Sequence, residues 1–352
     1  MPAARQNPLM LAERTLELVD TPSVSRDEAS IAEVVAAAVP LELVHRDGAS
    51  LVYATPRTGK PLILLAGHLD TVPAQGNIPG RIENGAVHGL GASDMKGGVA
   101  VMVELARWAA DAALAYDLAF LFFPREELGP DENPLPALFD AVPLLTEPSL
   151  VVVLEPTDNT IQAGCVGNLV ARAVFEGRSA HSARPWLGVN AIRLAVEGLR
   201  EVVALEPVDV EIEGLVFREV LSVTEIHGGI ASNVIPAIVE CTLNFRYAPN
   251  RTAAEAEVRL RELVPGRVDV LHNAPGAHVA VGSPLVRRLR EVGGFAVLPK
   301  QAWTNVSDFA ARGLDAINLG PGATRYAHTV DEQVEIAELE RTLDALTRFV
   351  SV

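Results

Sequence analysis

The stretch "GHLDTVP", residues 67–73, places a histidine and an aspartate two positions apart, directly after the apolar run "PLILLA" at 61–66. A short, wholly apolar run is typical of a strand that is buried on both faces of a sheet. Neither His68 nor Asp70 belongs in such a core unless the side chain is paired or binds a metal ion. The pattern therefore predicts a functional site at the end of a buried strand.

Two further apolar runs are also followed closely by acidic residues. "DLAFLFF" at 117–123 precedes Glu126 and Glu127, and "SLVVVL" at 149–154 precedes Glu155. Residues 95–113 carry apolar side chains at helical spacing, so the order strand, helix, strand predicts an α/β sheet. Ligands of such sheets bind beyond the carboxyl ends of the strands. We therefore expect the polar residues to meet at that edge.

The pattern changes after about residue 165. Alternating polar and apolar residues predict an antiparallel sheet with one face in water and two helices on the other. The strands are expected at 168–177, 208–214, 219–229 and 237–249, and the helices at 189–203 and 252–264. The α/β pattern then resumes with a helix at 283–292, a strand at 315–320 and a last helix from about 335. We therefore predict a discontinuous catalytic domain, residues 1–165 and 277–352, with an inserted α+β domain at 166–276.

Composition narrows the class of protein. The 352 residues are enough for two cores, and 29 basic against 45 acidic residues give a net charge of −16. This charge argues against binding to nucleic acid or to an anionic membrane surface. Only two cysteines, Cys165 and Cys241, are present, which argues against a disulfide framework. Residues 1–20 predict an amphipathic helix instead of a signal peptide, and no apolar run reaches about 18 residues. We therefore expect a cytoplasmic protein.

The polar residues at the predicted strand ends and in glycine-bearing loops all carry nitrogen or oxygen atoms that can bind a metal ion. They comprise two histidines and five carboxylates: His68, Asp70, Asp94, Glu126, Glu127, Glu155 and His328. One zinc-type ion uses three or four such ligands, whereas two ions about 3.5–4 Å apart that share a carboxylate would use most of the set. Singly, each motif has a simpler interpretation: a surface loop, a solvated turn or, for Asp94, a helix N-cap. Their recurrence at successive strand ends favours a metal site.

The chain resembles the M20 metallopeptidase family over nearly its whole length, in "GHLDTVP", "GASDMKGG", "REELGP", "LEPT", "SAHSARPWLGVNAI", "SNVIPA" and "AHTVDEQV". Within that family, it most resembles the actinobacterial-type succinyl-diaminopimelate desuccinylases, in "QAGCVGN", "AHSARPWLG" and "NLGPGATRYAHTVDEQV". The resemblance implies a zinc-aminopeptidase-like catalytic domain with an inserted, ferredoxin-like dimerisation or lid domain. It also implies two divalent metal ions. Zinc suits the ligands, and cobalt or manganese would fit the same set.

The resemblance assigns a role to each residue of the cluster. His68 and Glu155 would hold one metal ion, Glu127 and His328 the other, and Asp94 would bridge them. Asp70 would orient His68 by accepting its second ring N–H. Glu126 would act as general base on a bridging water that attacks an amide carbonyl, and would then protonate the leaving amine.

The inserted domain also matches functional residues of the family. His181 in "SAHSARPW" corresponds to a histidine that reaches across a dimer interface and donates to the carbonyl oxygen in the partner's active site. Arg246 in "NFRYAP" corresponds to an arginine that binds a substrate carboxylate. Asn233 corresponds to a residue near the substrate, and Arg184 and Thr304 are further candidates for substrate contacts. Without the resemblance, His181 would be a half-buried turn residue, and Arg246 would pair with an acid on a strand surface.

Two positions depart from the family pattern. Many members have an acidic residue before the glutamate pair, where this chain has Arg125, whose charge would lower the pKa of Glu126 unless the side chain points away. Proteobacterial desuccinylases carry a substrate-binding arginine near the position of Cys165, and Arg184 is the candidate to replace it. Cys165 itself is expected to be a buried structural thiol, with an approach to the metals as the alternative.

The sequence therefore predicts a homodimeric two-metal amidohydrolase for a small N-acyl amino acid, N-succinyl-LL-2,6-diaminopimelate above all. Other amidases of the same family are alternatives: N-acetyl-ornithine or N-acetyl-lysine deacetylases, the hydrolase that frees lysine from an amino-group carrier protein, aminoacylases and dipeptidases. A non-catalytic binding protein would not need Glu126 beside Glu127. A single-metal phosphoesterase is disfavoured because "GASDMKGG" lacks the spacing of a phosphate-binding loop.

Overall fold

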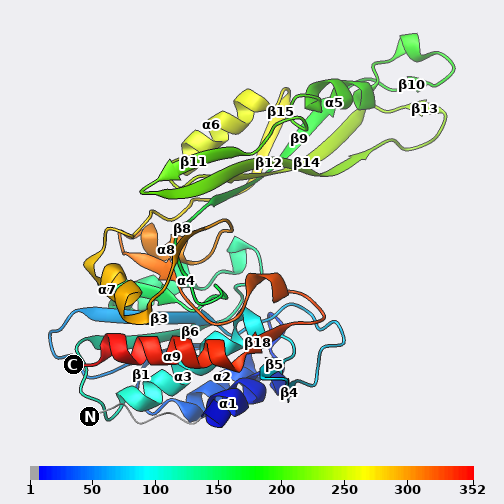
Figure 1. Ribbon diagram of the computed structural model, residues 1–352. Coiled ribbons are helices and arrows are strands. Elements are labelled where there is room, and N and C mark those ends of the chain that lie inside the picture. Colours follow the sequence, from blue (N-terminus) through cyan, green and yellow to red (C-terminus); the bar gives the residue numbers. More distant parts are fainter. Residues whose placement is uncertain (1–7) are drawn as a thin grey trace. The chain divides into compact units, whose positions relative to one another are not determined.

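The computed structural model describes residues 8–352, which form two compact units (Figure 1). Unit 1 holds residues 8–163, Ala280–Leu298 and Asp308–Val352, and unit 2 holds Gly164–Val279 and Pro299–Ser307. The division lies within three residues of the predicted boundaries, but residues 299–307 group with unit 2 although we expected them in the catalytic domain. The reason lies in local contacts, because Trp303 Nε1 and Ser307 Oγ both donate to the carbonyl of Pro275, at 3.1 and 2.6 Å.

The central feature of unit 1 is an eight-stranded sheet with the order β1-β2-β6-β3-β7-β17-β8-β16. Its strands are β1 (Glu42–Asp47), β2 (Ser50–Ala54), β3 (Leu62–His68), β6 (Asp117–Phe123), β7 (Leu150–Val153), β8 (Ile161–Cys165), β16 (Val297–Lys300) and β17 (Ala316–Asn318). The neighbours β6, β3 and β7 run parallel, and every residue in them is buried. This confirms the prediction that the three apolar runs are strands covered on both faces.

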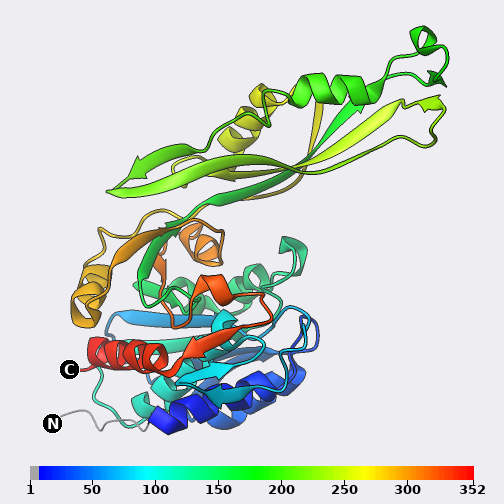
Figure 2. The same cartoon turned by 45° about the vertical axis from the view of Figure 1, so that its right-hand side comes forward.

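Helices α1, α3 and α9 pack against one another beside this sheet (Figures 1 and 2). The helices of at least seven residues outside unit 2 are α1 (Pro8–Asp20), α2 (Ala29–Ala38), α3 (Gly97–Ala109), α4 (Leu135–Ala141), α7 (Pro284–Gly293) and α9 (Ile336–Val350). The short helix α8 (Val306–Ala310) follows β16. The predicted N-terminal helix is present from Pro8 onwards, and residues 1–7 of that prediction lie outside the described residues.

A small sheet of unit 1 ties the C-terminal segment to the loop before α3. Its strand order is β18-β5-β4, with β4 at Arg81–Glu83, β5 at Ala86–His88 and β18 at Gln333–Glu335. The pairing sets Gln333 opposite His88, so the residue before β18 lies beside the residues that follow β5. The "GASDMKGG" segment comes next and forms the short helical turn η1 (Ala92–Lys96).

Unit 2 is an antiparallel sheet with the order β11-β12-β14-β9-β15. The strands are β9 (Gly167–Glu176), β11 (Val208–Ile212), β12 (Leu215–Gly228), β14 (Ile238–Tyr247) and β15 (Arg267–Ala274). Helices α5 (Ala191–Leu199) and α6 (Ala253–Leu263) share a buried apolar core with the alternate residues of β9 and β14. Apart from the edge strand β11, the chain order β9-α5-β12-β14-α6-β15 is the βαββαβ order of a ferredoxin-like unit. The predicted inserted α+β architecture is therefore confirmed.

No helix among residues 8–352 is both long enough and apolar enough to cross a membrane.

Helix α3 packs closely against the backbone just beyond the end of β7. A Cβ atom on Gly98 would lie 2.4 Å from the carbonyl oxygen of Leu154, which directly precedes Glu155. We predict that Gly98→Ala lowers the free energy of unfolding by roughly 1–3 kcal/mol in urea denaturation, because overpacking outweighs the small gain in helix propensity. Gly282→Ala is the matched control, since its Cβ would meet open space. Equal stability of the two variants would contradict the prediction.

Candidate metal centre

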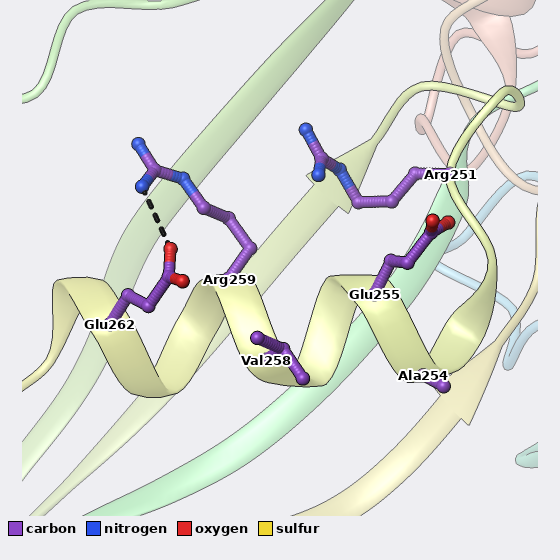
Figure 3. A pocket seen from close by; sticks show the side chains of 6 residues that line it. All are labelled: Arg251, Ala254, Glu255, Val258, Arg259 and Glu262. Carbon is purple, nitrogen blue, oxygen red and sulfur yellow. Dashed lines mark hydrogen bonds and ion pairs between the residues drawn. The ribbon is translucent and has the colours of Figure 1, made fainter.

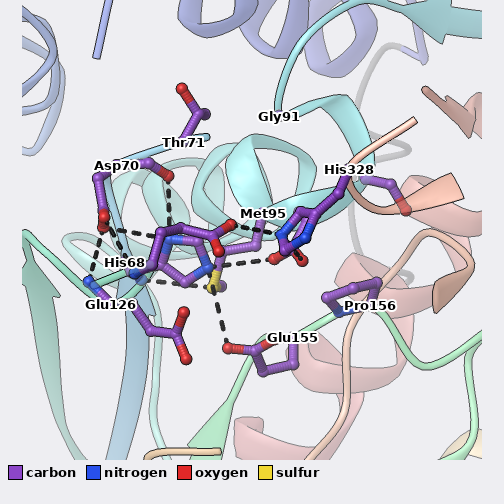
Figure 4. A network of polar contacts seen from close by, with 12 residues as sticks. His68, Asp70, Thr71, Gly91, Met95, Glu126, Glu155, Pro156 and His328 are labelled. Atoms are coloured by element: carbon purple, nitrogen blue, oxygen red, sulfur yellow. Dashed lines mark hydrogen bonds and ion pairs between the residues drawn. The ribbon is translucent and has the colours of Figure 1, made fainter. Parts of the chain in front are cut away.

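Three parallel strands deliver the first side chains of the site to one edge of the sheet. His68 is the last residue of β3, Glu126 follows the end of β6 by three residues, and Glu155 follows the end of β7 by two. Figure 4 shows His68, Glu126 and Glu155 grouped together, and His68 Nε2 lies 3.9 Å from Glu155 Oε1. The strand ends therefore meet as the sequence predicts.

Two further segments complete the cluster. Asp94 lies in η1, and its Oδ1 atom is 3.1 Å from His68 Nε2 while Oδ2 is 3.7 Å from His328 Nε2. His328 Nε2 is in turn 2.8 Å from Glu127 Oε1. Asp94 thus faces one histidine with each carboxylate oxygen. It does not cap α3, whose N-cap residue is Lys96.

The donor set fits divalent metal ions of the zinc type. Ligand atoms of His68, Asp94 and Glu127 all lie within 4.8 Å of one another. The contacts group His68 with Glu155 and His328 with Glu127, with Asp94 between the pairs. Imidazole and carboxylate are the ligands that zinc takes at catalytic sites. Metal ions in these two positions remain a prediction.

The carboxylate of Asp70 holds the first half of the site in place. Its oxygens accept the backbone N–H groups of Glu126 and Glu127, at 2.9 and 3.1 Å, and the hydroxyl of Ser25 at 2.7 Å. His68 Nδ1 lies 3.1 Å from the Asp70 carbonyl and 3.5 Å from Oδ1, which leaves Nε2 facing Asp94 and Glu155. Asp70 therefore fixes both a histidine ring and the glutamate turn.

Electrostatics within the cluster are strong because the charges are buried. Burial would raise the pKa of Asp70, but hydrogen bonds from His68 and Ser25 outweigh this and lower it. Burial lowers the pKa of His68, but hydrogen bonds to Asp70 and Asp94 leave it well above its usual value. Burial and the negative charge of Glu155 together raise the pKa of Glu126 well above its usual value. Glu126 is thus the carboxylate of this cluster best suited to hold a proton.

Arg125 points away from Glu126. Its side chain is exposed, and Nη1 lies 3.7 Å from Glu132 Oε2, with Arg26 on the same carboxylate. The positive charge of Arg125 therefore lies near Glu132 and not beside Glu126.

His328 has a strained backbone and a half-exposed ring. Its φ angle is +62°, in the left-handed region that few residues other than glycine adopt. Burial alone would lower the pKa of His328. The negative charge of Glu127 acts in the opposite direction, and the resulting pKa is raised. The backbone geometry aims the ring at Glu127.

Two residues of the site, Ser25 and Glu332, were not predicted from the sequence. Ser25 reaches Asp70 because Val24 forms a parallel bridge with Thr71, a pairing that no motif signals. Glu332 accepts the backbone N–H groups of Gly91, Ser93 and Asp94. Its only signal is the acidic pair "DE" that follows His328 by three residues.

Unit 2 brings together two of the residues predicted for substrate binding. Strand β10 (Ala180–His181) pairs with β13 (Val234–Ile235), and the Ser182 N–H donates to the carbonyl of Asn233 at 2.9 Å. His181 is exposed, and its Nδ1 accepts the Ala183 N–H at 3.1 Å. Because Nδ1 is an acceptor, a neutral ring carries its proton on Nε2, which makes His181 a hydrogen-bond donor to a ligand.

Arg246 lies on the face of β14 opposite the core of unit 2. It is half-buried, and its Nε donates to Asn244 Oδ1 at 2.9 Å, while the Asn244 amide donates to Asn168 Oδ1 at 3.1 Å. Among the described residues no acid is within ion-pair distance of Arg246, and burial lowers its pKa. The guanidinium is therefore held by neutral groups and not by a carboxylate.

The remaining predicted residues of unit 2 differ in exposure. Arg184 is exposed, and its backbone N–H donates to the carbonyl of His181 at 2.8 Å. Thr304 and Cys165 are buried, with the cysteine sulfur 4.0 Å from the Thr304 carbonyl oxygen. Cys165 is not part of the ligand cluster found among residues 8–352.

Figure 3 shows a surface hollow on α6. It is lined by Arg251, Ala254, Glu255, Val258, Arg259 and Glu262. Arg259 pairs with Glu262 at 3.2 Å, and Arg251 pairs with Glu219 at 3.0 Å. Since these charges satisfy one another, the hollow offers no reactive group.

Comparisons with known proteins agree with this geometry. Residues 64–352 match the peptidase family M20/M25/M40. A Mycobacterium tuberculosis protein provisionally named succinyl-diaminopimelate desuccinylase DapE is 38% identical over 345 residues, covering 96% of this chain and 97% of the relative. The succinyl-diaminopimelate desuccinylase of Corynebacterium glutamicum is 35% identical over 360 residues, covering 98% and 96%. The crystal structure of aminopeptidase PepT from Bacillus cereus shares the fold, with a TM-score of 0.80, 21% identity and 99% of each chain covered. The chain therefore belongs to peptidase family M20 and is a metal-dependent amide hydrolase.

Proposed function

We propose that this chain forms a cytoplasmic homodimer that hydrolyses N-succinyl-LL-2,6-diaminopimelate to succinate and LL-2,6-diaminopimelate in lysine biosynthesis. The observation that carries the chemistry is Asp94, which presents one oxygen to His68 and the other to His328. Such a carboxylate is suited to bridge two metal ions. The support for this substrate is the similarity to the two desuccinylases named above, over nearly the full length of both chains.

The ligand residues would hold two divalent ions, most suitably zinc. His68 and Glu155 would bind one ion, Glu127 and His328 the other, and Asp94 both. When bound, such ions polarise an amide carbonyl and make water acidic near neutral pH. Burial and repulsion among the carboxylates raise the pKa of Glu126 and of Glu127, and the charge of the ions would offset that repulsion.

Glu126 is proposed as the general base and acid. Its backbone N–H is fixed by Asp70, and its raised pKa suits a group that takes a proton from water and passes it to the leaving amine nitrogen. Glu127 is proposed as a ligand instead, because its carboxylate faces His328 at 2.8 Å. The adjacent glutamates therefore have separate roles.

Unit 2 is proposed to recognise the substrate through Arg246 and His181. A guanidinium held by the neutral amide of Asn244 has donors left for a substrate carboxylate, which it can bind with two parallel hydrogen bonds. His181 is proposed to donate from Nε2 to the amide carbonyl oxygen, which becomes negative during attack. Asn233, Arg184 and Thr304 are proposed as further substrate contacts.

The positions of His181 and Arg246 within unit 2 support a dimeric active site. His181 pairs with Val234 next to the start of β14, whereas Arg246 lies eight positions (246 − 238) beyond Ile238, the first residue of that strand. At about 3.3 Å per residue, the separation is roughly 26 Å. One small N-acyl amino acid does not span that distance, so we propose that the two groups of one subunit serve different active sites.

The proposed reaction is tested by turnover of three substrates side by side. We predict that purified protein loaded with zinc or cobalt hydrolyses N-succinyl-LL-2,6-diaminopimelate in preference to N-acetyl-ornithine and N-acetyl-lysine, as measured by release of the free amine. Glu126→Gln is expected to lower kcat by about 10²- to 10⁴-fold, the usual contribution of a general acid–base, while metal content is unchanged. Turnover of an acetyl compound instead would keep the chemistry and reject the substrate.

Arg246 provides a test of carboxylate recognition. We predict that Arg246→Met lowers kcat/KM for the succinyl substrate by about 10- to 100-fold, because hydrogen bonds to charged groups contribute about 1.5–3 kcal/mol. Arg172→Met is the matched control: Arg172 lies on the neighbouring strand β9, is exposed and pairs with Glu240 at 3.8 Å. An unchanged kcat/KM in Arg246→Met would argue against a carboxylate contact.

Asp70 provides a test of ligand orientation. We predict that Asp70→Asn weakens zinc binding by about 10- to 100-fold in calorimetric titration of the metal-free protein, because asparagine has one acceptor oxygen and no charge, so it cannot both orient the ring of His68 and hold the turn at Glu126 and Glu127. Asp117→Asn is the control, because Asp117 is also buried and accepts the backbone N–H of Thr58 at 2.9 Å, but lies at the opposite end of β6. Similar losses in both variants would indicate a general effect on stability.

A further inference from the structure

Glu332 is a buried carboxylate that the proposed chemistry does not use. Its Oε2 atom accepts the N–H of Gly91 at 2.8 Å, and Oε1 accepts those of Ser93 and Asp94, at 3.1 and 2.9 Å. Its side chain is buried. A buried carboxylate is costly unless hydrogen bonds compensate it, and here three backbone amides of one short turn offset part of that cost.

The backbone of Glu332 ties the same two segments together. Its carbonyl accepts the N–H of Gly89 at 2.9 Å, directly before strand β18 pairs with β5. Its own N–H donates to the carbonyl of Thr329 at 3.3 Å, next to His328. Glu332 is thus attached at one end to the segment that carries His328 and at the other to the turn that carries Asp94.

Lys96 lies at the far end of that turn. Its ammonium group is buried and donates to the Thr21 carbonyl at 2.9 Å, at the C-terminus of α1. The turn that positions Asp94 is therefore held by Glu332 on one side and by Lys96 on the other. Glu332 is the one of the two that contacts Asp94 itself.

We infer that Glu332 is a positioning residue for the second half of the metal centre, as Asp70 is for the first. It sets the carboxylate of Asp94 between His68 and His328 by fixing the backbone of residues 91–94 and by joining that turn to the segment of His328. This role rests on the two-metal site proposed above. Glu332 itself contacts neither the substrate nor the reacting atoms.

The test measures metal binding as well as turnover. Metal-free protein and Glu332→Gln are titrated with Co²⁺, and both affinity and the visible absorption spectrum of the bound ion are recorded. A glutamine has only one acceptor oxygen, so it cannot serve both Gly91 and the pair Ser93 and Asp94. We expect the dissociation constant to rise about 10- to 100-fold, the spectrum to change, and kcat to fall with KM nearly unchanged at saturating metal.

Glu338→Gln is the matched control. Glu338 is also a partly buried glutamate that accepts a backbone N–H, that of Gly322 at 2.8 Å, but it does not contact residues 91–94. This variant is expected to bind Co²⁺ within about twofold of the parent protein and to keep its spectrum, because the mutation removes a similar bond from outside the metal turn.

The outcomes separate the inference from the proposed function. If Glu332→Gln does not fold, Glu332→Asp keeps the charge but is one methylene too short to reach all three amides, and the same weakening is expected. A folded Glu332 variant that binds Co²⁺ like the parent protein would overturn the positioning role. A parent protein that binds no second metal ion would overturn the two-metal site, and the inference with it. Cobalt binding without desuccinylase activity would reject only the proposed substrate.

Discussion

The parallel pairing of β3 with β6 on one side and β7 on the other is the constraint on which the site depends. Parallel neighbours end at the same edge of the sheet, so the residues after three strands must converge there. His68, Glu126 and Glu155 come from positions up to 87 apart (155 − 68), yet they meet because of this register. The complete burial of the three strands keeps that register fixed, since a slip by one residue would turn every side chain to the opposite face.

Concentrating carboxylates at one edge of the sheet is electrostatically unfavourable, and hydrogen bonds from the backbone offset part of this cost. Asp70 and Glu332 each accept backbone N–H groups, which together with side-chain hydrogen bonds outweigh burial at Asp70 and offset only part of it at Glu332, whose pKa burial raises to about 7. At Glu126, the proposed general base, and at Glu127, a proposed ligand, burial together with repulsion from neighbouring carboxylates raises the pKa. Cations bound among these carboxylates would reduce that repulsion.

Local patterns were sufficient to predict the three buried strands and an inserted antiparallel sheet with two helices, whereas the ferredoxin-like architecture and the separate roles of the cluster residues came from the resemblance to the family. Ser25 and Glu332 were missed because their roles depend on long-range pairing, of Val24 with Thr71 and of β18 with β5. Residues 299–307 group with unit 2 through long-range contacts of the same kind, since the side chains of Trp303 and Ser307 bond to Pro275. The direction of Arg125 likewise depended on Glu132, a residue that no motif linked to it.

The length of strand β14 in unit 2 separates the residues that are proposed to bind the substrate. Strand β14 connects the segment that holds His181 and Asn233 to the segment that holds Arg246, and it keeps them apart as a rigid element would. Both faces of this strand are used, because Leu243, Phe245 and Tyr247 pack in the core while Asn244 and Arg246 occupy the other face. In the proposed roles, this ten-residue strand separates Arg246, which would bind a substrate carboxylate, from His181, which would donate to the carbonyl oxygen. A protein that needs both groups around one small substrate can obtain them from two copies of the chain. The distance between the two groups within one copy therefore favours the proposed homodimer.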